Sequence, residues 1–281
     1  MTVVSNRITS WFLINIKART DQQPSHYVQT LKNLEKEDPM VELRREKCIS
    51  LKSIEFSPET DNNSICKWIK LKLISYTIID TDSFYNKREK EDVHIDDWDN
   101  DIVANRKEAE VYFIPSVHTV AVKQNSQINI KHIVEYFSES LNRLEPETFD
   151  VNIITERDVL DQILNAYSIQ KIEASILYSN PSSTNGFRGA FDSKLRAMNP
   201  SQFEIVAKGT KDNPLVNEED GMINAIVDAA ERDGNIIATI MPTEGAKLVR
   251  IDSREHPRKL RIPQIVHSIG ASLYNAMINI F

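Results

Sequence analysis

Apolar and polar residues alternate along several segments, which is typical of strands with one buried face. The clearest case is residues 67–79, where Ile69, Leu71 and Leu73 alternate with two lysines. An antiparallel sheet that packs on a core on one side has this pattern. Weaker patterns of the same kind predict strands over residues 12–17, 48–56, 111–114, 119–123, 149–154, 172–178, 203–208, 236–241, 248–252 and 259–262.

Other segments place apolar residues three and four positions apart, which predicts helices. In residues 130–144 one face carries six large apolar side chains. Thr155 is placed to cap a helix over residues 155–166, and Asp233-Gly234 is placed to end another. The predicted helices are residues 26–37, 130–144, 155–166, 217–232 and 265–281.

The order of these elements favours an α+β fold in which helices cover antiparallel sheets. We expect two sub-domains, residues 1–180 and 181–281, because residues 180–200 read as a long loop. Residues 82–107 are crowded with charges of both signs and predict an exposed loop or insertion. A second boundary inside that stretch is an alternative.

Composition places the chain among globular proteins, since 41% of its 281 residues are hydrophobic and 27% are charged. The apolar patch at residues 11–16 is too short to span a membrane. Cys48 and Cys66 are too few for a disulfide framework and are expected to be reduced. These features predict a cytoplasmic protein without a membrane segment.

Familiar catalytic and cofactor motifs do not occur in the sequence. It contains no phosphate-binding loop, no dinucleotide fingerprint and no serine-nucleophile elbow. Adjacent Arg254, Glu255 and His256 form an acid–base trio, but neighbours on an extended chain point to opposite faces and would not all converge. His118 is expected to be a packed strand residue. We predict no cofactor and name no catalytic residue.

An acidic stretch holds the candidate metal ligands Asp97, Asp99, Asp101 and Glu108. Their spacing matches the first, third, fifth and twelfth positions of a calcium loop. The sixth position is Ile102, where such loops need glycine for a sharp turn. A solvated acidic loop is the competing interpretation. The same acids would serve a metal-dependent nuclease if the fold brought them to a basic groove.

Charge is distributed unevenly along the chain. The net charge is −7, yet residues 181–281 hold 12 basic and 12 acidic residues. Residues 250–261 carry a net charge of +3. Because lysine and arginine bind phosphates with release of counterions, this stretch predicts a nucleic-acid site, with a solvated surface as the alternative. Its candidate residues are Arg250, Arg254, Arg258, Lys259 and Arg261, with Arg188 from the preceding loop.

The last predicted helix, residues 265–281, carries an apolar stripe. It would dock a protein partner or a second copy of the chain, or it would pack on the chain's own sheet.

The C-terminal part resembles an uncharacterised prokaryotic and phage family, a domain of unknown function met near mobile elements and anti-phage defence genes. The residues that carry the likeness are Lys208-Gly209-Thr210, the helix that ends near Asp233-Gly234, the hairpin after it, and residues 252–257. The order of elements is also loosely similar to that of phage-exclusion Rex A-type proteins, which bind DNA.

The resemblance implies an intracellular defence or phage-exclusion protein that binds nucleic acid, DNA more readily than RNA, and acts by sensing or blocking. Two alternatives stay open: a metal-dependent nuclease effector, and a non-catalytic adaptor or antitoxin-like subunit.

Overall fold

The computed structural model describes residues 8–19, 21–44, 47–95, 99, 101–177, 193–194, 197–198, 202–210, 212–218, 221–263 and 268–281. Its strands are β1 (Ile8–Ala18), β2 (Val41–Glu42), β3 (Lys47–Phe56), β4 (Ile69–Thr77), β5 (Phe84–Asn86), β6 (Glu91–Val93), β7 (Ala104–Ile114), β8 (Thr119–Lys123), β9 (Phe149–Ile153), β10 (Ser168–Leu177), β11 (Gln202–Lys208), β12 (Gly234–Met241), β13 (Val249–Asp252) and β14 (Lys259–Pro263). Its helices are α1 (Pro24–Glu37), α2 (Ile130–Leu144), α3 (Arg157–Leu164), α5 (Met222–Asp233) and α6 (Ile269–Ile278), with 3-10 turns η1 (Thr81–Ser83), η2 (Pro115–Val117) and η3 (Ser253–Glu255).

Eight strands form the larger sheet, in the order β14-β1-β8-β7-β4-β3-β2, with β9 also paired to β1. Every strand pair in it is antiparallel. The first half of β1 pairs with β14 and the second half with β9, so these two strands lie end to end along one edge of β1. The other edge of β1 pairs with β8.

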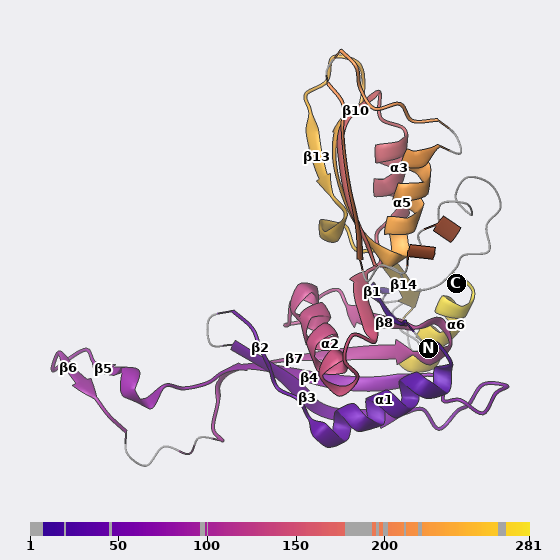
Figure 1. Cartoon of the computed structure of the whole chain (residues 1–281). Helices are drawn as coiled ribbons and strands as arrows, with labels where there is room; N and C mark the ends of the chain where they lie inside the picture. The colour runs from indigo at the N-terminus through magenta and orange to yellow at the C-terminus, as the bar shows by residue number, and fades with distance from the viewer. Residues whose placement is uncertain are drawn as a thin grey trace, which may run out of the picture.

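Helices cover both faces of the larger sheet (Figure 1). On one face, α1 and α2 bury Leu34 and Phe137 against the strands. On the other face, α6 buries Leu273 and Met277 beside Trp68. The alternation in β4 has its cause here, because Ile69, Leu71 and Leu73 point into the first of these cores and the lysines between them point to the opposite face.

The smaller sheet has four antiparallel strands in the order β11-β10-β12-β13. Helices α3 and α5 pack on one of its faces and enclose a second core. No described helix covers its other face, which we call the open face (Figure 1). The α+β class with antiparallel sheets is therefore confirmed.

Strand pairing crosses the position at which the sequence suggested a boundary. Strand β10 lies before residue 180 and pairs with β11 and β12, which lie after it. After β13 the chain returns to the larger sheet as β14 and α6. A division of the chain at residue 180 would therefore separate paired strands.

The charged stretch at residues 82–107 is more ordered than an irregular loop. It contains the β5–β6 hairpin, which projects from the body of the molecule (Figure 1). Its last residues, from Ala104, already belong to β7. The sequence missed this hairpin because its strands are three residues long and bury no alternating apolar side chains.

Three local predictions need correction. Helix α3 begins at Arg157 with Glu156 at its N-cap, because Thr155 is occupied in a β-bridge with Pro257. Helix α5 begins at Met222, five residues after the predicted start. His118 lies in the turn after η2, at a φ of 54°, and its ring stacks on Tyr27. The predicted start of the last helix, residues 265–267, lies outside the described residues.

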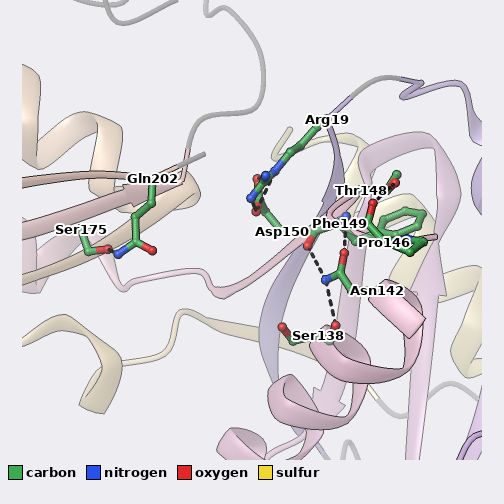
Figure 2. Close-up of polar contacts among 9 residues, drawn as sticks. All are labelled: Arg19, Ser138, Asn142, Pro146, Thr148, Phe149, Asp150, Ser175 and Gln202. Carbon is green, nitrogen blue, oxygen red and sulfur yellow. Dashed lines mark hydrogen bonds and ion pairs between the residues drawn. The ribbon is translucent and has the colours of Figure 1, made fainter. Parts of the chain in front are cut away.

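Two polar contacts fasten β9 to its neighbours (Figure 2). Arg19, just after β1, donates through Nη2 to Oδ1 of Asp150 at 2.8 Å. Asn142 of α2 accepts from the backbone N–H of Phe149 at 3.0 Å and donates to its carbonyl at 2.8 Å. These contacts matter to the site below because the chain leaves β9 directly for α3.

Candidate functional site

On the open face of the smaller sheet, a row of paired residues runs across all four strands and carries three cations. Lys208 of β11 pairs in register with Lys171 of β10. Lys171 pairs with Thr239 of β12, and Thr239 pairs with Arg250 of β13. We call Lys208, Lys171 and Arg250 the basic row. Because side chains alternate along a strand, these three project away from the core formed with α3 and α5.

The carboxylate of Glu173 lies in the row next to the basic row. Lys171 forms an ion pair with this carboxylate. This contact, reinforced by the charges of Arg250 and Lys208, lowers the pKa of Glu173. Lysines directly opposite one another, as Lys208 and Lys171 are, destabilise a sheet. Stability of the fold therefore does not account for this arrangement.

The rest of the open face is mostly polar and includes the apolar side chains of Val206 and Ile237. The row next to the cations holds Val206, Glu173, Ile237 and Asp252. Beyond it, Gln202 donates through Nε2 to Oγ of Ser175 at 2.9 Å (Figure 2). Val206 is 59% exposed, as expected for a face without a covering element.

Two of the predicted basic residues, Arg254 and Arg258, contact other side chains of the same chain. The guanidinium of Arg254 donates to both carboxylate oxygens of Asp252, at 2.9 and 2.6 Å, and holds the pKa of Asp252 below its usual range. Arg258 lies 3.8 Å from the carboxylate of Glu231 and 5.4 Å from the ring centre of Phe281. Of the five residues predicted in the stretch 250–261, only Arg250 belongs to the basic row.

The remaining two, Lys259 and Arg261, face a cleft between the two sheets. Its volume is about 690 Å³. One wall comes from the start of α3 and another from the segment between η3 and β14. Glu255 and His256 of the predicted trio both line this cleft, whereas Arg254 does not. The three residues therefore do not all converge, as expected, although Glu255 and His256 share the cleft.

The described candidate metal ligands, Asp99, Asp101 and Glu108, are spread over a turn and a strand. Asp97 and the candidate Arg188 lie outside the described residues. Asp99 accepts from the backbone N–H of Asp101, a local turn contact between two exposed residues. Glu108 lies on β7 and pairs with Lys52 and Arg106, and the contact with Lys52 is the main reason that its pKa is lowered. Among the described residues, no group of three potential metal ligands comes together.

The apolar stripe of the last helix is used within the chain. Leu273 and Met277 are fully buried against the larger sheet. Gly270 lets α6 approach Trp68 closely, because a Cβ there would lie 2.4 Å from the indole ring. Ile278 and Ile280 stay exposed at the end of the helix. Leu273 and Met277 are therefore not available for a partner, and docking of a partner at the exposed end of the helix stays a prediction.

Sequence reasoning missed Lys171 and named Lys208 only in the motif that carries the family likeness. The alternation in β10 and β11 places each lysine on a polar face, which is a detectable signal. Their position beside Arg250 depends on strand register between segments up to about eighty residues apart, which a single sequence does not reveal.

Comparison with known proteins identifies the family of the chain. A family model described as Domain of unknown function (DUF4747) matches residues 7–277, and the chain therefore belongs to this family. The resemblance to an uncharacterised domain family is thus confirmed. No protein with a curated description matches the sequence. No helix among the described residues is both long and apolar enough to cross a membrane.

Proposed function

We propose that this member of the family acts inside the cell by binding nucleic acid, with DNA as the preferred form, across the open face of its smaller sheet. The observation that carries the proposal is the basic row. Lys208 and Lys171 are direct neighbours on β11 and β10, and Arg250 lies two strands further along the same row. Two of these cations, Lys208 and Arg250, have no ion-pair partner among the described residues.

The dimensions of the row suit a phosphate backbone. Neighbouring strands lie about 4.8 Å apart, so four strands span about 14 Å. That length corresponds to roughly four phosphates along one strand of a duplex. Val206 and Ile237, in the next row, offer apolar surface for sugars or bases.

The net charge of −7 supports a local interface. A chain with this charge repels a polyanion over most of its surface, so binding depends on the patch where cations gather. The face has a mixed character, with acids in the row beside the cations, which favours a limited contact of a few phosphates.

The direct test is fluorescence anisotropy with labelled single- and double-stranded DNA and RNA across a series of salt concentrations. We expect Lys171→Ala, Lys208→Ala and Arg250→Ala together to reduce the slope of log affinity against log salt by about 2 to 3, since each phosphate contact contributes roughly 0.7 to 0.9. The matched control removes three exposed lysines elsewhere, Lys36, Lys47 and Lys131, and should leave the slope unchanged.

Two results would contradict the proposal. Absence of binding at about 50 mM salt, where phosphate contacts are strong, would reject nucleic-acid recognition. Equal slopes for the triple variant and the wild type would reject the basic row as the interface. Incubation of the same probes with Mg²⁺ or Mn²⁺ tests for cleavage, and loss of intact probe would favour the nuclease alternative.

A role in phage exclusion or anti-phage defence is part of the proposal and rests on the resemblance of the C-terminal motifs. Its test is the plating efficiency of a phage panel on cells that express the wild type or the triple variant. We expect protection from the wild type alone. Equal protection by both would separate the defence role from the basic row.

A further inference from the structure

The cleft between the two sheets has features that nucleic-acid binding at the open face does not use. Its floor is the edge of the larger sheet, where Lys259 pairs with Phe12 and Arg261 pairs with Ser10. Leu260 and Ile262, which alternate with the two cations, are buried on the opposite face. Lys259 and Arg261 therefore both project into the cleft, about 7 Å apart along the strand.

Carboxylates face these cations from the walls. Glu156 and Asp158 come from the start of α3, and Glu255 comes from η3. Within the described part of the chain, none of the three forms an ion pair with Lys259 or Arg261. Because these cations and carboxylates do not form ion pairs with one another, both are available to a ligand. The cations can bind a phosphate group, and the carboxylates can accept hydrogen bonds from the ligand's donors.

The walls are held in place by the backbone. The N–H of Glu156 donates to the carbonyl of His256 at 2.9 Å, and the N–H of Arg258 donates to the carbonyl of Ile154 at 2.7 Å. The carboxylate of Glu156 accepts from the N–H of Lys259 at 2.8 Å. These hydrogen bonds join the segment that leads from β9 to α3 with the segment that leads from η3 to β14. The cleft is therefore preformed, as small-molecule sites usually are.

Size and charge narrow the class of ligand. A volume of about 690 Å³ lies in the range of small-molecule pockets and greatly exceeds inorganic phosphate or a free amino acid. Lys259 and Arg261 suit a phosphate group, Arg261 by forked hydrogen bonds. The carboxylates suit sugar hydroxyls or a base amino group, and Phe12 offers an apolar surface to a ring. A continuous nucleic-acid strand would place further phosphates against these carboxylates.

We infer that this cleft binds a mononucleotide, with its phosphate on Lys259 and Arg261 and its sugar or base directed to Glu156, Asp158 and Glu255. The site is separate from the open face, so it stands or falls independently of nucleic-acid binding.

Isothermal titration calorimetry of the full chain with AMP, GMP, CMP and UMP tests the inference, with adenosine and inorganic phosphate as partial ligands. We expect one-to-one binding of at least one nucleotide, and at least tenfold weaker binding of both partial ligands. Lys259→Ala with Arg261→Ala should weaken nucleotide binding at least tenfold. Lys123→Ala, on the neighbouring strand β8 but outside the lining of the cleft, is the matched control and should bind as the wild type does.

Three outcomes would overturn the inference: no nucleotide binds, inorganic phosphate binds as tightly as the nucleotides, or the double variant binds as the wild type does. Circular dichroism confirms folding of each variant, and Arg261→Ala alone, at an exposed side chain, replaces the double variant if that fails to fold. The variant without the basic row should keep nucleotide affinity, which distinguishes failure of this site from failure of the open face.

Discussion

Replacement of Asp150 by asparagine should destabilise the junction between β1 and β9. Asp150 is 5% exposed and accepts from Nε and Nη2 of Arg19 (Figure 2). Asparagine has nearly the same size, so the change removes the charge and leaves the packing. The guanidinium of Arg19 then keeps a neutral acceptor in place of a carboxylate.

The expected loss in the free energy of unfolding is about 2 kcal/mol. Breaking a fully buried ion pair costs about 3–5 kcal/mol. Two features reduce that figure here. The Arg19 side chain is 26% exposed and can recover water. Burial raises the pKa of Asp150 in spite of the opposing effect of Arg19, which means that desolvation of the carboxylate outweighs its attraction to Arg19. The expected loss therefore comes from the charge of Arg19, which keeps only a neutral acceptor in the variant.

Urea denaturation followed by circular dichroism measures this loss, with linear extrapolation to water. The matched control is Glu139→Gln, which removes a carboxylate from the exposed pair with Arg143 on α2. That pair should contribute no more than about 0.5 kcal/mol. If Asp150→Asn and Glu139→Gln had equal effects, the reasoning that burial governs the strength of these pairs would be refuted.

Two further predictions concern the packing of α1 and α6. Burial lowers the pKa of His26, but its hydrogen bonds to the Asp21 carbonyl and the Glu145 carboxylate outweigh burial and raise the pKa overall. The protonated ring therefore stabilises the fold fully below the ordinary histidine pKa of about 6.5. This stabilisation is lost as the pH rises through the raised pKa of His26. His26→Ala should therefore lower the urea midpoint more at pH 5.5 than at pH 9. An equal loss at both values would mean that the ring acts by packing alone. Gly270→Ala should lower the free energy of unfolding by about 1–3 kcal/mol, because its Cβ would lie 2.4 Å from the Trp68 ring. Thermal unfolding measures this loss, with Asn275→Ala, at an exposed position of the same helix, as the control. A melting temperature equal to that of the control would show that the ring can move aside.

Local pattern was sufficient for most of the secondary structure. The helix predicted over residues 130–144 has those bounds in the structure, because its six apolar residues recur at helical spacing and Asn129 caps it. Strand β4 follows from strict alternation, since its polar positions face the opposite side from the core. Such periodicities depend on neighbours within one or two turns or pleats, which the sequence displays directly.

Element ends were less accurate wherever a distant segment intervened. Thr155 has the chemistry of a helix cap, yet it pairs with Pro257 about a hundred residues away. His118 has the neighbours of a strand residue, yet it adopts a left-handed turn and stacks on Tyr27. In both cases a contact outside the local window decides the conformation.

The basic character of residues 250–261, the antiparallel α+β class and the family of the chain can all be read from the order of its residues. The sites cannot, because they depend on which strands pair and in what register. A one-residue shift would move Lys171 to the buried face and disperse the basic row. Likewise, Lys259 reaches the cleft only because β14 pairs with β1, some 250 residues earlier in the chain. Pairing over that distance is selected by the total burial of apolar surface, a property of the whole fold.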